Sequence, residues 1–160
     1  MYKKVNPRPL NKEWFFEDYL EGTFMEIGPI HVKKIDLIEF ALRYDPQPIH
    51  IDHEASKKGP YKGLIASGWQ TCALVMRKLV EQYFSPSSSL GSPGIDELKW
   101  LKPVRPGDRL TVRATILETK LSRSKPDRGL VRTLVEALNQ QHEKVVSFKA
   151  LNFMLLSKYN

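Results

Sequence analysis

The sequence predicts an α+β fold, in which one long helix packs against a curved antiparallel sheet. The helix is expected at residues 67–84, where apolar residues recur at helical spacing. Strand-like runs separated by turn residues fill the second half of the chain, at 96–104, 108–121, 129–140 and 143–156. Because these runs are long and successive, we expect an antiparallel meander whose apolar face the helix covers. A chain of 160 residues is expected to form one domain, 1–160.

The first half of the chain is expected to hold one strand and one short helix. Residues 24–32 contain branched side chains and predict the strand. Residues 35–44 predict the helix, which should end near Asp45 because Pro46 disfavours helical geometry in the residue before it. Three apolar residues are expected to share one face of this helix: Ile35, Ile38 and Leu42.

The 67–84 helix is expected to be heavily buried. Its apolar residues form one broad stripe, which Leu74 and Val75 widen. Ser67 is a good N-cap candidate. The stripe consists of Trp69, Cys72, Ala73, Met76, Leu79, Val80 and Tyr83. The stretch 85–94, rich in serine, proline and glycine, is expected to be a mobile connection.

The composition excludes several classes of protein. Cys72 is the only cysteine, so no internal disulfide and no cysteine-based zinc site can form, and a reducing cytoplasm is the expected compartment. No stretch reaches the about 18 apolar residues of a membrane helix, and the N-terminus lacks the apolar region of a secretory signal. The net charge of +7 favours anionic partners, but the basic residues are dispersed. We therefore expect no nucleic acid and no membrane partner, and favour a phosphorylated small molecule such as coenzyme A.

Residues 43–52, Arg-Tyr-Asp-Pro-Gln-Pro-Ile-His-Ile-Asp, hold an aspartate and a histidine between prolines. Each proline fixes its own φ and restricts the residue before it. Asp45 and His50 are therefore expected in a stiff segment, where a carboxylate beside an imidazole can orient the ring or help to activate a water. On residue types alone, a rigid turn in which His50 packs or caps is the alternative.

A second motif, Gly-Leu-Ile-Ala-Ser-Gly-Trp at 63–69, leads into the long helix. Gly68 is expected at the helix start, where backbone N–H groups lack intrahelical acceptors and the helix dipole adds positive potential. Such a terminus can stabilise a negative oxygen, including the enolate that develops from a thioester. The alternative is a glycine that only allows tight packing.

In order, the two motifs give the pattern D-x-x-P-x-H-x-D, a variable loop and G-x-I-A-x-G, running from residue 45 to residue 68. This pattern resembles the MaoC-like dehydratase family, also called (R)-specific enoyl-CoA hydratases. The resemblance implies the hot-dog fold, in which an antiparallel sheet wraps around a long central helix. It also implies a homodimer whose sheets join edge to edge, with a coenzyme A tunnel at the subunit interface.

The resemblance further implies a hydro-lyase of fatty acid metabolism, which adds water reversibly to a trans-2-enoyl thioester of coenzyme A or acyl carrier protein. Asp45 and His50 match the family's catalytic pair, which binds and activates one water. Gly68 matches the glycine whose N–H binds the thioester oxygen. No cofactor is implied, because coenzyme A is part of the substrate.

Five further residues are expected to contact the substrate. Gln47 and Ser67 depart from the family pattern, which usually has asparagine and histidine at these positions. Trp69 is large and should restrict the acyl chain if it borders the acyl pocket. Arg123 and Lys125, in an expected hairpin, are candidates for the phosphates of coenzyme A.

Two other functions fit the same sequence. A hot-dog acyl-CoA thioesterase would direct water to the carbonyl carbon, and a non-catalytic subunit would only hold an acyl thioester or a partner chain. A metal site is not expected, because His-Ile-Asp-His at 50–53 lacks the i, i+4 pairing of zinc-binding helices. Asp52 is expected instead to cap a short helix, and Cys72 to be a buried, unreactive thiol.

Overall fold

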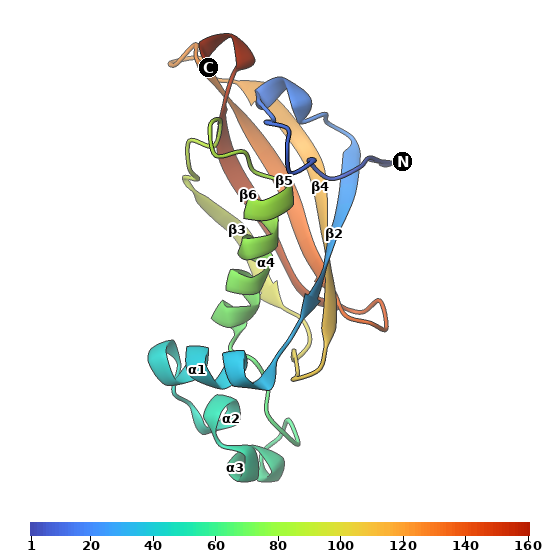
Figure 1. The fold of residues 1–160 in the computed structure, drawn as a ribbon, viewed down its shortest axis with the longest axis vertical. Helices are drawn as coiled ribbons and strands as arrows, with labels where there is room; N and C mark the ends of the chain where they lie inside the picture. The colour runs from blue at the N-terminus through green and yellow to red at the C-terminus, as the bar shows by residue number, and fades with distance from the viewer.

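Six strands form one sheet in the computed structural model, which describes residues 1–160. The strand order is β1-β2-β4-β5-β6-β3, and every neighbouring pair is antiparallel except β1 and β2. The strands are β1 (Lys3–Lys4), β2 (Thr23–His31), β3 (Gly94–Trp100), β4 (Arg109–Leu121), β5 (Arg128–Leu138) and β6 (Lys144–Leu155). The sheet curves around one long helix, α4, so the predicted hot-dog fold is confirmed (Figure 1).

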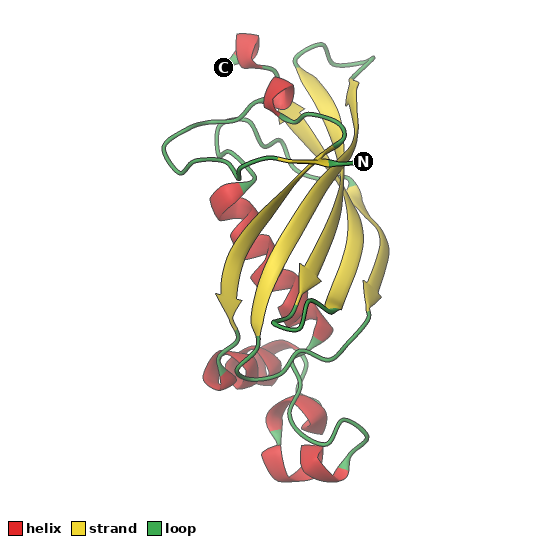
Figure 2. Ribbon diagram, turned by 90° about the vertical axis from the view of Figure 1, so that its right-hand side faces the viewer, coloured by secondary structure: helices red, strands yellow, loops and turns green.

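The helices divide into a central one and a group beyond the end of the sheet. α4 (Gly68–Gln82) runs along one face of the sheet, whereas α1, α2 and α3 lie past the strand ends (Figures 1 and 2). These three helices are α1 (Lys34–Tyr44), α2 (Pro48–Ile51) and α3 (His53–Lys58); two 3₁₀ turns lie at η1 (Phe16–Asp18) and η2 (Ser157–Tyr159). No helix combines the length and the apolar character needed to cross a bilayer.

The main core lies between α4 and the concave face of the sheet. Val75, Leu79 and Tyr83 of α4 are at most 1% exposed, because their spacing places them on one helix face. They pack into a cluster with inward-facing strand residues, among them Met25, Ile27, Val112, Val135 and Phe148. The Tyr83 hydroxyl is hydrogen-bonded to Thr133 Oγ1 at 2.6 Å, so this buried polar atom has a partner.

The prediction that α4 is heavily buried is wrong. Only part of the predicted apolar stripe is exposed, along the outer side of the helix. We call these four exposed residues the α4 stripe: Trp69, Ala73, Met76 and Val80. The helix is apolar on two sides, and the sheet of a single chain covers only one of them.

α1 also buries a different face from the one predicted. Leu37 and Ala41 are fully buried, whereas Ile35 and Leu42 are each 59% exposed. Both sets have helical spacing, so periodicity alone did not decide between them. The helix ends at Asp45 as predicted, with the Asp45 N–H donating to the Ala41 carbonyl at 2.9 Å.

The predicted meander holds for β4, β5 and β6 but not for β3. β3 pairs with β6 at the far edge of the sheet, and β4 pairs instead with β2. A tight hairpin between β3 and β4 is disfavoured because Pro103 and Pro106 interrupt their connection. The connection therefore passes the ends of β6 and β5 between the edge strand β3 and the inner strand β4.

The connection at 85–94 is anchored rather than mobile in its first half. Ser85 and Ser88 are completely buried. The Ser85 hydroxyl accepts from the Trp14 N–H at 2.6 Å, and the Ser88 hydroxyl donates to the Trp14 carbonyl. These bonds satisfy buried backbone groups of the N-terminal segment, which the sequence motif did not indicate.

The faces of α1 can be tested with two leucines on the same helix. We expect Leu37→Ala to lower the free energy of unfolding by about 2–5 kcal/mol, because it leaves a cavity in the core. Leu42→Ala, at an exposed position, should change it by no more than about 0.5 kcal/mol. Urea denaturation of both variants measures this difference, and equal losses would contradict the observed burial.

Candidate functional site

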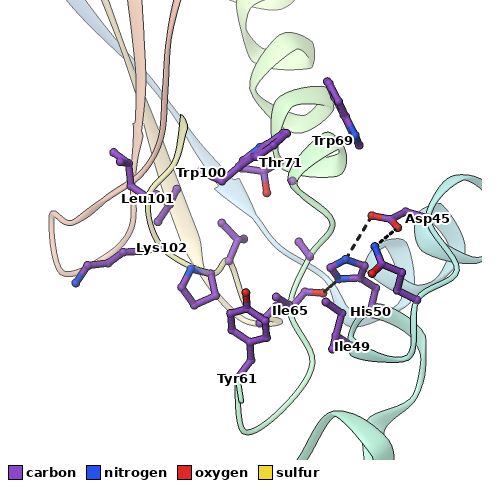
Figure 3. A pocket seen from close by; sticks show the side chains of 16 residues that line it. Asp45, Ile49, His50, Tyr61, Ile65, Trp69, Thr71, Trp100, Leu101 and Lys102 are labelled. Carbon is purple, nitrogen blue, oxygen red and sulfur yellow. Dashed lines mark hydrogen bonds and ion pairs between the residues drawn. The ribbon is translucent and has the colours of Figure 1, made fainter. Parts of the chain in front are cut away.

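A cavity of about 450 Å³ lies where α2, the N-terminus of α4 and the β3–β4 connection meet. Its wall combines polar side chains from the 45–50 segment with apolar side chains from α4 and the end of β3 (Figure 3). This mixture, in a cavity of this size, is typical of sites for small molecules.

The cavity brings Asp45 and His50 together. Asp45 ends α1, and Pro48 begins α2, where its fixed φ suits the first helical position. This one-turn helix aims His50 back toward Asp45, so that His50 Nε2 lies 3.3 Å from Asp45 Oδ2. His50 is 5% exposed, and Asp45 borders the open cavity (Figure 3).

The second motif fixes the orientation of the His50 ring. His50 Nδ1 lies 2.8 Å from the carbonyl oxygen of Ile65, which can only accept a hydrogen bond. Nδ1 is therefore the donor, and in the neutral ring Nε2 is left as an unprotonated acceptor facing the carboxylate. The Ile65 N–H in turn donates to the Ile49 carbonyl at 3.2 Å, so α2 and the 63–67 segment hold each other.

Asp45 is kept ionised by its neighbours. The Gln47 side chain donates from Nε2 to Asp45 Oδ1 at 2.6 Å, and this bond is the main reason that the pKa of Asp45 lies below its ordinary value. Ser67 is completely buried and forms no regular hydrogen bond, yet its hydroxyl also helps to lower the pKa of Asp45. The carboxyl is thus charged at neutral pH and protonates only as the pH falls below the usual range.

Gly68 begins α4, as predicted, and lines the same cavity. Its N–H belongs to the first turn of a 15-residue helix and has no intrahelical acceptor. Ser67 occupies the N-cap position, but its side chain does not cap the helix. The helix terminus therefore offers unsatisfied N–H groups and positive potential beside the Asp45–His50 pair.

Most of the predicted site residues gather at this cavity. Asp45, Gln47, His50, Gly68 and Trp69 line it, and Ser67 lies buried behind its wall.

Arg123 and Lys125 are not brought to the cavity. They belong to the β4–β5 hairpin, at the end of the sheet where the C-terminus lies, opposite α1, α2 and α3 (Figure 1). The Asp127 carbonyl beside them accepts from the Leu156 N–H at 2.8 Å, which ties the hairpin to that end.

The motifs missed several residues of the site. Tyr61, Trp100 and Lys102 line the cavity, and Arg105 donates from its guanidinium to the Tyr61 carbonyl at 2.6 Å. Trp100 and Lys102 come from the end of β3 and the loop after it, which carry no motif. Only the pairing of β3 with β6 places them opposite Asp45.

The chain shows no metal-like cluster, since no three His, Cys, Asp or Glu side chains come together. Asp52 caps α3 as predicted, because its Oδ1 accepts from the N–H groups of Glu54 and Ala55, both at 2.9 Å. Cys72 is half-buried rather than buried as predicted, and this burial still raises the pKa of its thiol, which disfavours the reactive thiolate.

Comparisons with known proteins agree with this geometry. Residues 16–139 match the family model described as MaoC like domain. The uncharacterised protein YdeM of Bacillus subtilis is 30% identical over 129 residues, which are 81% of this chain and 90% of YdeM. A MaoC-like dehydratase from Rhodospirillum rubrum has a TM-score of 0.83 and 35% identity, covering 89% of this chain and 97% of that one. The R-hydratase PhaJ1 of Pseudomonas aeruginosa has a TM-score of 0.72 and 26% identity, with coverages of 89% and 85%.

The contact between Gln47 and Asp45 predicts a change in titration. In Gln47→Leu the carboxylate loses its main donor, so the pKa of Asp45 should rise toward its ordinary value. Carbon-detected NMR of the aspartate carboxyls would follow this shift. Gln140→Leu, which removes a remote bond to Asp108, is the control and should leave Asp45 unchanged. An unaltered Asp45 titration in Gln47→Leu would rule out the proposed cause.

Proposed function

Because this chain belongs to the MaoC-like domain family, we propose that it is an (R)-specific hydro-lyase, which interconverts a trans-2-enoyl thioester and a 3-hydroxyacyl thioester. One observation carries the proposal: the Asp45–His50 pair shares a cavity with the free N-terminus of α4 at Gly68. The pair supplies groups that handle water, and the helix terminus supplies donors for a thioester oxygen.

The Asp45–His50 pair binds and activates the water. His50 Nε2 and Asp45 Oδ2 lie 3.3 Å apart at the cavity, so a water beside them can donate an O–H to one of these acceptors while it remains in contact with the other. The low pKa of Asp45 keeps its oxygen available as an acceptor at neutral pH. A base that is held within hydrogen-bond reach of the water accelerates its attack.

Addition of water then proceeds through an enolate. The water oxygen bonds to the β-carbon while the pair takes up one proton, and the electrons of the double bond move onto the thioester oxygen. The Gly68 N–H and the α4 dipole stabilise this negative oxygen. The pair returns a proton to the α-carbon as the enolate collapses, so the net change is addition of H and OH across the double bond.

The substrate is a coenzyme A or acyl-carrier-protein thioester, and no separate cofactor is needed. Two positive side chains lie near the site and suit a phosphate-bearing carrier: Arg105, bound to the Tyr61 carbonyl, and Lys102 in the cavity wall, whose ammonium also pairs with Glu143. They replace Arg123 and Lys125 as our candidates for this contact. The single, half-buried Cys72 suits a cytoplasmic enzyme.

Replacing Asp45 tests the reaction directly. Asp45→Asn keeps the shape of the side chain but removes the charge, so kcat for hydration of crotonyl-CoA should fall by about 10²–10⁴-fold, with an unchanged circular dichroism spectrum. Loss of absorbance at the enoyl-thioester band measures the rate.

Asp52→Asn is the matched control, because Asp52 belongs to the same motif but caps α3, a role that asparagine also fills. It should retain wild-type turnover. Wild-type rates in Asp45→Asn would disprove the assigned role. Release of free thiol from acyl-CoA, detected with a thiol reagent, would indicate a thioesterase instead, and binding without turnover would indicate a non-catalytic subunit.

We also propose that the protein is a homodimer. β3 is an edge strand with β6 on one side only, and the α4 stripe is exposed next to it. Trp69 of the stripe contacts Trp100 of β3, with ring centroids 5.3 Å apart, so the two features form one continuous apolar surface. An unpaired strand edge beside such a surface favours pairing with a second copy.

A charge in the α4 stripe should separate the subunits. The wild-type protein is expected at twice the 18.5-kDa mass of one chain, and Met76→Asp at the mass of the monomer. Light scattering after size-exclusion chromatography measures both masses. Tyr2→Asp, which is also exposed but lies beside β1 at the opposite edge of the sheet, should remain dimeric. A dimeric Met76→Asp would exclude the stripe from the interface.

A further inference from the structure

The indole of Trp100 packs against Gly68 at the start of α4, on the side where a β-carbon would project, next to the proposed site of the thioester oxygen. A methyl group built on Gly68 would lie only 2.4 Å from Trp100 Cε2, so the ring is packed directly on the Gly68 backbone. The ring also meets Trp69 edge to face, with centroids 5.3 Å apart at 79°. Two tryptophans thus form a continuous wall beside the reacting position (Figure 3).

The backbone holds this wall in place. Trp100 ends β3 and is paired with Val146 of β6. The next residue, Leu101, donates its N–H to the Val145 carbonyl at 2.8 Å. The backbone of Trp100 is consequently held at a fixed strand end, and the packing of the indole on Gly68 and Trp69 holds the ring against α4.

Charge is distributed unequally around the cavity. On one side the Arg105 guanidinium is bonded to the carbonyl of Tyr61, and Lys102 lies nearby with its ammonium paired to Glu143. Trp69 and Trp100 form an uncharged side next to Gly68. A thioester bound at Gly68 has a polar, phosphate-bearing carrier and an apolar acyl chain. The charged side therefore suits the carrier, and the tryptophan side suits the acyl chain.

We propose that Trp100 is the residue that limits acyl-chain length, closing the acyl end of the cavity together with Trp69 so that short, unbranched enoyl thioesters are preferred. This inference rests on the proposed hydration reaction and names its substrate class. An apolar pocket discriminates by roughly 10-fold or more for each methylene group that it cannot accommodate. A fixed indole at the end of the chain should thus exclude long acyl groups.

The test compares a long and a short substrate in Trp100→Leu. We expect the ratio of kcat/KM for decenoyl-CoA to kcat/KM for crotonyl-CoA to rise by about 10-fold or more over wild type. Trp100→Phe should give an intermediate ratio. Because Trp100 is 48% exposed on an edge strand, the smaller side chains leave the main core intact.

Tyr2→Leu is the matched control. Tyr2 is an aromatic residue that is 50% exposed, lies beside β1 at the opposite edge of the sheet and does not line the cavity, so its ratio should stay at the wild-type value. An unchanged ratio in Trp100→Leu would overturn the inference. A uniform fall for both substrates would also overturn it, because it would place Trp100 beside the carrier rather than the acyl chain.

Binding separates this inference from the hydration proposal. Calorimetry with butyryl-CoA and decanoyl-CoA requires no turnover, and Trp100→Leu should bind decanoyl-CoA at least several-fold more tightly than wild type does. If no enoyl-CoA is hydrated but this gain in binding is observed, the tryptophan wall is supported and the reaction is wrong. Hydration without any change in chain preference would support the reaction and overturn the role of Trp100.

Discussion

The hydrogen bond from His50 to the Ile65 carbonyl is the constraint on which the site depends. It joins His50, in the segment stiffened by Pro46 and Pro48, to Ile65, in the segment that precedes α4. In the sequence, α3 and a loop separate these two segments. Because a carbonyl can only accept, this bond also decides which ring nitrogen carries the proton. Orientation and protonation of His50 are thus set by backbone that belongs to the other motif, and Asp45 needs only to face the remaining nitrogen.

The same backbone segment connects the site to the fold. The Ala66 N–H donates to the Val104 carbonyl at 2.7 Å, which joins the lead into α4 to the β3–β4 connection. The inner face of α4 is fixed by packing on the sheet. The core therefore holds the backbone N–H groups at the N-terminus of α4 in a fixed position. The outer face of α4 is apolar, and no other part of the chain covers it. One helix consequently provides a core face, a site for a negative oxygen and a surface for a second subunit.

The residues that sequence reasoning placed correctly are those whose role is local. Pro46 follows the end of α1, Asp52 caps the helix that follows it, and Gly68 begins α4, whereas the one-turn helix α2 at Pro48 was expected only as a stiff segment. The wrong predictions concern which face of a helix is buried and which strand β3 pairs with. α1 and α4 each carry apolar residues on more than one face, and only packing selects the face that is buried. The pairing of β3 is likewise a long-range choice that strand propensity does not contain.

By itself, the sequence determined the α+β class, the order of the elements and the proximity of Asp45 to His50, because propensity, proline restriction and short spacing act within a few residues. It also determined that Gln47 lies near Asp45, although not that its amide donates to the carboxylate. Only the tertiary structure decided that Trp100, Lys102 and Tyr61 share the cavity and that Arg123 and Lys125 do not. The reason is that β3 pairs with β6 only when the whole sheet curves around α4. This long-range arrangement cannot be derived from the residues of any single segment.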